Sequence, residues 1–210
     1  MARRLVYVMD PMCSWCWGFS PVVQALSDQA ASAGVSLHLV LGGLRTGHTA
    51  LDAPTRARIL DHWHSVNQAT GQPFDVEGAM PPGFVYNTEP ACRAVVAARR
   101  VDPALALPMA QAIAQAFYRD GTDVTRTAAL VDLAEALGMA RIRFAEAFDA
   151  PVTVEATQAD FTWSHSLGIS GFPTVLAERD RQFALLTNGY QPLEELAPLL
   201  ARWLDRATAL

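Results

Sequence analysis

Lysine is absent from the sequence, since all 16 basic residues are arginines. Schiff-base catalysis needs a lysine amine, and a P-loop needs a lysine that reaches the bound phosphates. Pyridoxal-type and P-loop enzymes are therefore excluded. Positive charge is also scarce, because the formal net charge is -5 and the only adjacent basic residues are Arg3-Arg4 and Arg99-Arg100. Nothing suggests a phosphate-binding surface, so we do not expect nucleic acid as a partner.

Long hydrophobic runs are missing as well. A membrane-spanning helix needs about 20 predominantly apolar residues in a row, and no stretch approaches that length. After the arginines at positions 3 and 4, only five apolar residues precede Asp10-Pro11, which leaves no room for a secretory signal peptide. We therefore expect a cytoplasmic location and no membrane partner, unless a leader was removed from the recorded sequence.

Cysteine is sparse, with three residues in 210. Small secreted domains stapled by disulfides use many more. Two of the three form the motif Cys13-Ser14-Trp15-Cys16, which follows an apolar run and precedes a helical pattern. The unpaired N–H groups and the dipole of a helix N-terminus favour negative charge, and a thiolate is the attacking species in disulfide exchange. Cys13 is therefore the candidate nucleophile, and Cys16 is the candidate resolving thiol.

This motif has two alternatives to a redox role. It could be half of a zinc site, or the two cysteines could be incidental core residues. Zinc normally needs a second pair of ligands at similar spacing, and the sequence has none. His62 and His64 are two residues apart in a helical pattern and point to different faces, so a shared metal is not expected. The lone Cys92 fits a small buried hydrophobic residue better than a regulatory or ligand role. We predict a redox motif and no metal site.

The order of secondary-structure signals indicates an α/β fold. A buried strand over 4–9, a helix over 20–33 and a strand over 35–41 form a β-α-β unit, which implies parallel strands. This first helix is predicted to start with Ser20 as its N-cap and Pro21 in its first turn. Six helical patterns follow, at 53–69, 88–101, 103–118, 125–137, 140–148 and 152–167. A β-hairpin formed by 174–176 and 183–186 comes next, and an amphipathic helix over 192–206 is the last element.

A thioredoxin-like sheet with an inserted all-helical domain fits this order. The chain is 51% hydrophobic, which is enough for one well-filled domain that carries an insertion. The first and last segments would complete one sheet, and the helices between them would form a layer beside Cys13. We place the thioredoxin-like domain at residues 1–44 and 168–210, and the inserted helical domain at 45–167.

The segment Gly171-Phe172-Pro173-Thr174 enters a predicted strand. A sheet tolerates proline only at an edge, a first position or a bulge, because proline lacks a ladder donor. In a thioredoxin-like fold this position holds a cis proline that faces the active-site disulfide, and the backbone of Phe172 would be free to bind an extended substrate. The alternative is an ordinary trans proline that starts a strand. The presence of the Cys13 motif favours the cis form.

Aromatic residues surround the two cysteines and could form an apolar rim for a substrate. Trp17 and Phe19 fit equally well in the core of the first helix, which is the commoner location of such side chains. Trp15 lies between the cysteines, and we expect it to be exposed. The candidate substrate-binding residues are Ser14, Trp15, Phe172 and Pro173.

Asp10 precedes Cys13 by three residues and has two possible roles. A nearby carboxylate is a plausible general base for a buried thiol, so Asp10 is a candidate proton relay to Cys16. Asp-Pro also commonly initiates a turn. We favour the turn.

Seven stretches that span nearly the entire chain carry a family resemblance: CSWCWGFSPVV, GGLR, HWHSVNQATGQPF, GFVYNTEPACRAVVAAR, AFYRDGTDVT, GISGFPTV and TNGYQP. Together they resemble the DsbA-family thioredoxin-like oxidoreductases, in particular the cytoplasmic branch described as predicted protein-disulfide isomerases. The resemblance implies a thioredoxin fold with an inserted helical domain, Cys13 and Cys16 as the redox pair, and Pro173 as the cis proline. The dipeptide Ser14-Trp15 lacks the histidine that helps to make the DsbA prototype so oxidising, so strong oxidant behaviour is not expected.

The leading hypothesis is a thiol–disulfide oxidoreductase or isomerase that acts on protein or peptide thiols and disulfides. Glutathione is a candidate redox partner, and no metal or organic cofactor is required. The second hypothesis is a glutathione-dependent transferase or isomerase of the kappa or hydroxychromene-carboxylate isomerase type, although such enzymes typically carry serine or another residue where the first cysteine would be. The third is a non-catalytic thiol-binding or chaperone module that uses the aromatic rim.

Overall fold

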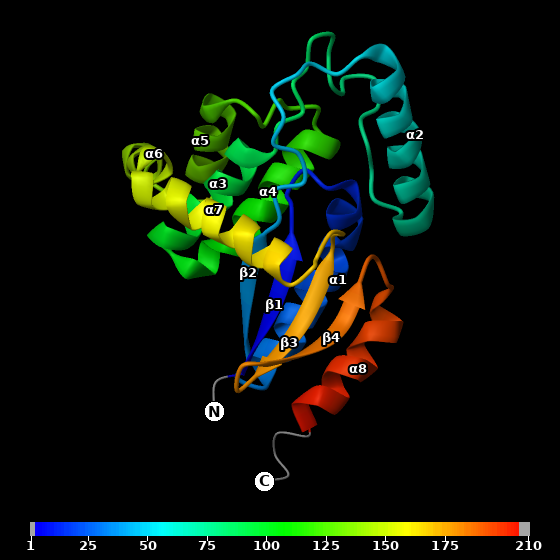
Figure 1. Ribbon diagram of the computed structural model, residues 1–210, viewed down its shortest axis with the longest axis vertical. Helices are drawn as coiled ribbons and strands as arrows, with labels where there is room; N and C mark the ends of the chain where they lie inside the picture. Colours follow the sequence, from blue (N-terminus) through cyan, green and yellow to red (C-terminus); the bar gives the residue numbers. More distant parts are fainter. Residues whose placement is uncertain (1–2, 206–210) are drawn as a thin grey trace.

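The computed structural model of the protein describes residues 3–205 and contains a mixed four-stranded sheet. Its strands are β1 (Arg3–Met9), β2 (Ser36–Leu41), β3 (Thr174–Arg179) and β4 (Gln182–Asn188), in the order β2-β1-β3-β4. β1 and β2 are parallel, as the β-α-β unit predicts, whereas β3 pairs antiparallel with both β1 and β4. The first and last parts of the chain therefore complete one sheet, as expected (Figure 1).

Eight α-helices and one short 3-10 helix accompany the sheet within the described residues. They are α1 (Ser14–Ser32), α2 (Ala53–Thr70), α3 (Glu89–Val101), η1 (Pro103–Leu105), α4 (Ala106–Tyr118), α5 (Thr127–Ala136), α6 (Arg141–Asp149), α7 (Pro151–Ser166) and α8 (Leu193–Asp205). All six helical patterns predicted between residues 53 and 167 are present, and they lie between β2 and β3 in the chain. The fold is thus a thioredoxin-like sheet with a helical insertion, as the sequence predicts.

The start of α1 differs from the prediction, because the helix begins at Ser14 and not at Ser20. Pro21 lies inside the helix, where a proline costs about 3 kcal/mol through a lost hydrogen bond and a steric clash. Full burial of one large apolar side chain contributes about 1.5–3 kcal/mol. Several apolar side chains on both sides of the proline are buried, including Phe19, Val22 and Val23. Packing therefore outweighs the local cost, and the helix continues through Pro21.

Successive residues of β1 belong to two hydrophobic clusters on opposite faces of the sheet. Tyr7 and Met9 join the large core that contains the buried residues of α1. Val6 and Val8 join a smaller cluster that packs against Trp163 of α7. The strand is therefore buried on both faces, as its continuous apolar sequence predicts, and Figure 1 shows α1 and α7 on opposite sides of the sheet.

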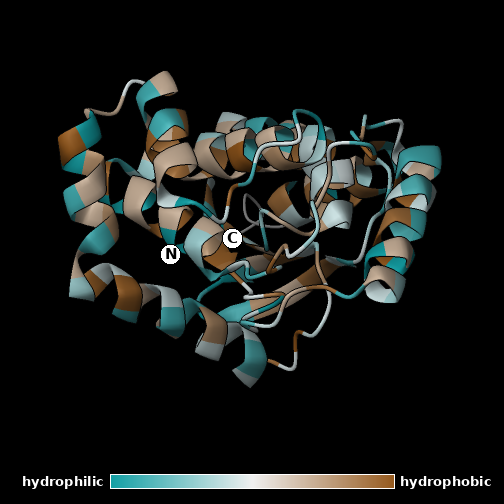
Figure 2. Ribbon diagram, turned by 90° about the horizontal axis from the view of Figure 1, so that it is seen from above, coloured by the Kyte–Doolittle hydropathy of each residue, from teal (hydrophilic) through white to brown (hydrophobic). Residues whose placement is uncertain are grey.

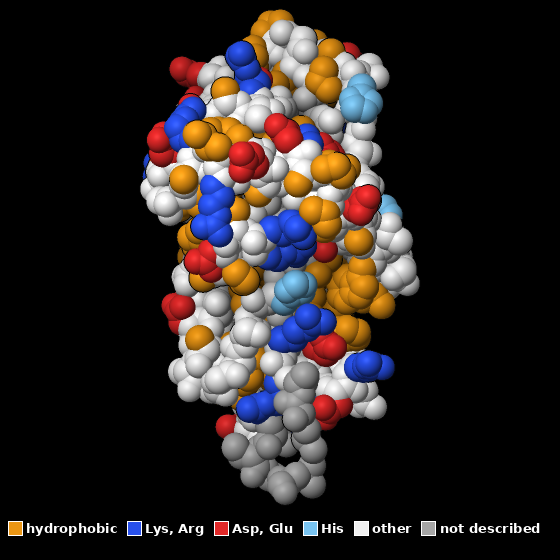
Figure 3. Space-filling view, turned by 90° about the vertical axis from the view of Figure 1, so that its left-hand side faces the viewer, with side chains coloured by type: hydrophobic (Ala, Val, Ile, Leu, Met, Phe, Trp, Pro, Cys, Tyr) orange, Lys and Arg blue, Asp and Glu red, His pale blue; other side chains and the backbone are white. Residues whose placement is uncertain are grey.

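The inserted helices pack around α3, which contacts α4, α5, α6 and α7. Figure 1 shows α2 standing apart from this group, with the start of α1 between them. The peripheral helices alternate between hydrophilic and hydrophobic residues along their length (Figure 2), which is typical of helices with one solvated side. On the face drawn in Figure 3, side chains of both charges are mixed with scattered hydrophobic ones. Across residues 3–205, no helix combines the length and apolar character that a membrane span requires.

Candidate active site

Cys13 lies where β1 ends and α1 begins. The Cys13 N–H donates to the Asp10 carbonyl at 3.0 Å and closes a turn between the strand and the helix. Cys13 is the N-cap of α1 and has an extended backbone, and its carbonyl accepts the N–H of Trp17 at 3.0 Å. Its sulfur therefore lies at the helix N-terminus, as the sequence predicts, where negative charge is stabilised.

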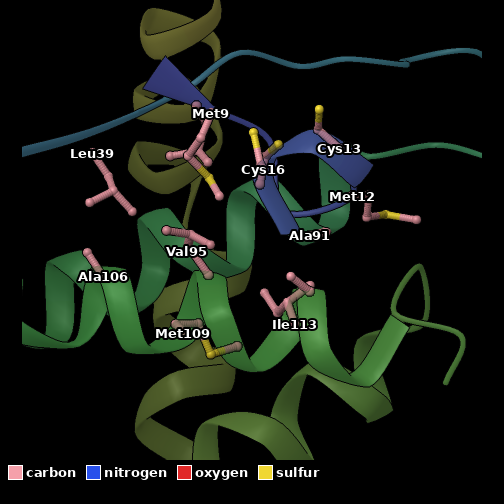
Figure 4. Close-up of a cluster of buried hydrophobic side chains, with 14 of the residues drawn as sticks. Met9, Met12, Cys13, Cys16, Leu39, Ala91, Val95, Ala106, Met109 and Ile113 are labelled. Carbon is pink, nitrogen blue, oxygen red and sulfur yellow. The ribbon is translucent and has the colours of Figure 1, made fainter. Parts of the chain in front are cut away.

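Cys16 lies one helical turn after Cys13 and is more deeply buried, at 2% exposure compared with 7%. Both thiols are free, and Figure 4 shows them next to each other at the start of α1. Burial, and then the hydrogen bond and charge of Cys13, raise the pKa of Cys16 well above its ordinary value, while the Asp10 N–H counteracts part of this effect. Cys16 therefore holds its proton in the reduced protein.

The loop before β3 lies against Cys13. The peptide bond between Phe172 and Pro173 is cis, as predicted. The Cys13 sulfur is 3.7 Å from the Phe172 carbonyl oxygen, to which it donates. A Cβ atom on Gly42, which directly follows β2, would lie only 1.9 Å from the Phe172 ring. The absence of a side chain at Gly42 thus allows the Phe172 ring to pack closely over the end of β2.

A cavity of about 560 Å³, which we call the Cys13 pocket, opens beside the first cysteine. Four of the candidate residues named from the sequence line it, and these are Cys13, Ser14, Trp15 and Phe172. Pro173 is buried and is not one of its lining residues. Three further lining residues carry or can carry positive charge and were not selected from the sequence: Arg45, Arg58 and His62. They follow β2 or belong to α2, so the insertion gives the pocket a cationic side.

Trp15 is half-buried, which corrects the expectation that it is exposed. Its ring lies between two others, at 5.9 Å from the ring of His62 and 5.8 Å from that of Tyr190, measured between centroids. Packing of α2 beside α1 covers part of the indole, a contact between separate helices that local sequence does not reveal. Trp17 and Phe19 are buried in the core, as favoured.

Asp10 is fully buried, and its carboxylate ties together three segments around the site. It accepts hydrogen bonds from the N–H of Met12 at 2.8 Å, the N–H of Leu44 at 2.7 Å, the hydroxyl of Thr88 at 2.6 Å and the thiol of Cys92 at 3.3 Å. Burial raises the pKa of Asp10, although these hydrogen bonds oppose the rise. The bond to Met12 confirms the turn that the Asp-Pro sequence favours. A proton relay stays a prediction.

Two tyrosines that were not selected from the sequence hold the residue before Cys13. The hydroxyls of Tyr86 and Tyr118 donate to the Met12 carbonyl at 2.6 and 2.5 Å. Both come from the helical insertion, Tyr118 as the last residue of α4. The two tyrosines are recognised as part of the site only by their hydrogen bonds to Met12, which lies 74 and 106 residues earlier in the chain. No local sequence motif indicates these contacts.

Cys92 is buried in α3, as predicted, and burial raises its pKa well above the ordinary value. Among the side chains of residues 3–205, no group of three or more His, Cys, Asp or Glu is arranged to hold a metal ion. The chemistry available at this site therefore centres on two thiols, a buried carboxylate and a pocket with a cationic side.

The fold and the site together define a class. A thioredoxin-like sheet, two thiols one turn apart at the start of its first helix and a cis-proline loop beside the first sulfur are the parts of a thioredoxin-fold oxidoreductase. The family model described as DSBA-like thioredoxin domain matches residues 4–201. The chain belongs to this family, in agreement with the resemblance found in its sequence.

Several solved structures are similar to the chain over nearly its whole length. A candidate protein disulfide isomerase from Nitrosomonas europaea is 42% identical, with a TM-score of 0.92, and the match covers 98% of this chain and 99% of that one. The cytosolic disulfide reductase DsbM from Pseudomonas aeruginosa is 31% identical, with a TM-score of 0.80, over 95% and 98%. A structure of DsbM with GSH matches at 26% identity and a TM-score of 0.75, over 99% and 100%. Among curated protein sequences, none matches significantly.

Proposed function

We propose that this protein is a thiol–disulfide oxidoreductase that exchanges disulfides with protein or peptide substrates through Cys13 and Cys16. The position of the Cys13 sulfur carries the proposal: it lies at a helix N-terminus, borders the Cys13 pocket and is 3.7 Å from the Phe172 carbonyl. Cys16, with its raised pKa, suits the second role, because it holds its proton until the resolving step. The 31% identity to a cytosolic disulfide reductase supports both the reaction and a cytoplasmic location.

The proposed reaction moves two electrons in two steps. The Cys13 thiolate attacks a substrate disulfide, forms a mixed disulfide and releases one substrate sulfur as a thiolate, which takes up a proton. Cys16 then loses its proton and attacks the Cys13 sulfur. This second step releases the other substrate sulfur as a thiol and leaves a Cys13–Cys16 disulfide. The same steps in reverse oxidise a substrate dithiol, and the reduction potential of the pair decides the direction.

The substrate chain is proposed to bind along the loop that contains Pro173. Extended peptides bind such loops through main-chain hydrogen bonds, which tolerate different side chains. Trp15 and Phe172 are partly buried apolar residues of the pocket, and a peptide gains free energy when its own apolar side chains cover them. Ser14, at the first turn of α1, offers a hydroxyl at the same edge.

Glutathione is the proposed reductant that restores the two thiols. Its two carboxylates suit a pocket with Arg45 and Arg58 on one side and His62 nearby. One glutathione thiolate opens the Cys13–Cys16 disulfide, and a second releases the first as oxidised glutathione. A relative has been solved with GSH, which supports this choice. The cycle requires no metal or organic cofactor.

Two serine variants test the division of labour between the thiols. Cys13→Ser should abolish reduction of insulin, because the attacking sulfur is gone. Cys16→Ser should still attack and then accumulate as a mixed disulfide, because only the resolving step is lost. The measurements are turnover by insulin precipitation and the mass of the trapped complex. The control is Cys92→Ser, which keeps a hydrogen-bond donor for Asp10 and should retain turnover.

Other outcomes of the same assays would favour the other hypotheses. Efficient glutathione conjugation to an electrophile that is unchanged in Cys16→Ser, together with no protein-disulfide turnover, would contradict the proposal and favour a transferase. Binding of unfolded peptides without any thiol exchange would favour a chaperone module. Iodoacetamide labelling of Cys92 before Cys13 at mildly acidic pH would refute the role given to the helix N-terminus.

A further inference from the structure

Tyr7 of β1 carries a hydroxyl group that the mechanism above does not use. The residue is 1% exposed, and its hydroxyl oxygen is buried without a hydrogen-bond partner among residues 3–205. A buried hydroxyl without a partner is unfavourable, and phenylalanine would fill the same space without that cost. A partner that exists only at one stage of the reaction would account for the hydroxyl.

The Tyr7 ring packs against the face of α1 that carries Cys16. Tyr7 belongs to the same side of β1 as Met9 and to the same hydrophobic core as Cys16. Its ring centroid is 6.0 Å from that of Phe19. Phe19 and Cys16 are three residues apart on α1 and therefore share one face of the helix, one turn from each other. The aromatic ring thus packs against the helix face on which the second thiol lies.

The electrostatics of the two groups agree with this packing. Burial raises the pKa of Tyr7, and the next largest cause is the charge of Cys16. In the other direction, the Tyr7 hydroxyl lowers the pKa of Cys16, because it can act as a donor to the thiolate form, and so opposes the effect of burial. Among the described residues, the backbone N–H of Asp10 also lowers it. A Cys16 thiolate would therefore have two donors, of which Tyr7 is the side chain.

Because resolution by Cys16 is part of the proposed function, the inference rests on it. We propose that the Tyr7 hydroxyl donates a hydrogen bond to the Cys16 sulfur when that sulfur becomes a thiolate in the resolving step. The Cys16 thiolate forms a bond to the Cys13 sulfur, and the bond between Cys13 and the substrate breaks. The leaving substrate sulfur takes the electron pair and the proton that Cys16 released. Tyr7 keeps its own proton throughout.

This arrangement favours the reacting state over the resting state. In the reduced protein the hydroxyl has no partner, so the hydrogen bond adds nothing to the stability of the starting thiol. The bond forms only when negative charge develops on the sulfur, and such differential interactions lower the barrier. When an external thiol opens the Cys13–Cys16 disulfide, Cys16 is the leaving thiolate, and the same hydrogen bond stabilises it.

Tyr7→Phe tests the inference, because it removes only the hydroxyl. The reduced enzyme is mixed with a peptide disulfide, samples are quenched with acid, and mass spectrometry follows the mixed disulfide. The variant should attack as fast as the wild type and resolve at least about tenfold more slowly, the effect expected for a hydrogen bond to a charged group. Its unfolding midpoint in urea should be equal to or higher than that of the wild type, because an unpartnered buried hydroxyl is gone.

Two comparisons make the outcomes distinct. Tyr190→Phe also removes a tyrosine hydroxyl in the neighbourhood of Trp15, and it should leave the resolving rate unchanged.

Equal resolving rates in Tyr7→Phe and the wild type would overturn the inference. A parallel loss of attack rate, resolving rate and stability would also overturn it, since it would indicate a purely structural tyrosine. Absence of a mixed disulfide in Cys16→Ser, together with no turnover by the wild type, would instead refute the proposed function. Failure of Tyr7→Phe to fold would also overturn the inference, because a hydroxyl without a partner in the resting state adds nothing to the stability of the fold.

Discussion

At the scale of single residues, Asp10 shows how a buried charge links the site to stability. Its folded-state pKa is raised, chiefly by burial, so the folded protein holds this proton more tightly than the unfolded chain does. The proton therefore stabilises the fold fully at pH values below the ordinary carboxyl pKa. This contribution is lost as the pH rises through the raised pKa.

The consequence is a measurable difference in slope between the wild type and Asp10→Asn. Between the ordinary carboxyl pKa and the raised one, the free energy of unfolding of the wild type should contain a falling component that the variant lacks. Urea titrations at a series of pH values provide the measurement. The absolute stability of the variant should also be lower above the raised pKa, because the ionised carboxylate accepts all four hydrogen bonds and an amide cannot.

Asp52 provides the control of opposite sign. It is the N-cap of α2 and accepts from the Thr55 N–H at 2.8 Å. Hydrogen bonding with the side chain of Thr55, and then with its backbone N–H, lowers the pKa of Asp52. Its contribution is therefore present above the ordinary carboxyl pKa and lost as the pH falls through the lowered one. If Asp10→Asn and Asp52→Asn change the pH slope in the same direction, the role assigned to burial at Asp10 is wrong.

At the scale of secondary-structure elements, the sequence predicted which segments form helices and strands but not how two of them meet. Helices and strands are recognised from hydrophobic periods of 3.6 and 2 residues, which involve only neighbouring residues in the sequence. The helix stops at Gly138 and Gly168 are recognised from the local sequence in the same way. The start of α1 was misplaced because the cost of Pro21 is local, whereas the burial that overcomes it comes from the distant core. The half-burial of Trp15 has the same origin, since it depends on how α2 packs beside α1.

The junction between β2 and the cis-proline loop leads to a prediction about Gly42. A Cβ at this position would lie within 1.9 Å of the Phe172 ring, so Gly42→Ala must displace the ring. Overpacking of this kind typically costs about 1–3 kcal/mol, and the displaced loop should bind protein substrates less well. Urea unfolding and the KM for a peptide disulfide are the measurements.

Gly47→Ala is a matched control in the same loop, because a Cβ there meets nothing within 4 Å. It should change stability by at most about 0.5 kcal/mol, as for surface substitutions in general. Equal effects of Gly42→Ala and Gly47→Ala on stability and KM would mean that the contact between Gly42 and Phe172 does not position the loop.

At the scale of the whole molecule, the site is an assembly of segments that are far apart in sequence. The Cys13 motif and the Pro173 loop are short sequence motifs, so they could be predicted from the sequence together with the thioredoxin-like sheet. The cationic side of the Cys13 pocket and the two tyrosines on Met12 come from the insertion, where no local pattern distinguishes them from surface or core residues. The division of the chain at residues 45 and 168 stays a prediction.

The balance of charges over the whole molecule bears on the reduction potential of the Cys13–Cys16 pair. Strong oxidants of this class owe their high potential to a stabilised reduced form. Here the dipeptide Ser14-Trp15 brings no charge, and burial raises the pKa of Cys16 well above its ordinary value, which disfavours a thiolate at that position. Arg45 and Arg58 favour a thiolate, but both are exposed and therefore screened by water and salt.

The burial of Cys16 should therefore dominate, and the pair should be reducing. We predict a potential closer to that of thioredoxin, about -270 mV, than to that of DsbA, about -120 mV. Equilibration of the protein with mixtures of reduced and oxidised glutathione, followed by alkylation and mass spectrometry, gives the value. A wild-type potential near the DsbA value would mean that the screened arginines outweigh the burial of Cys16.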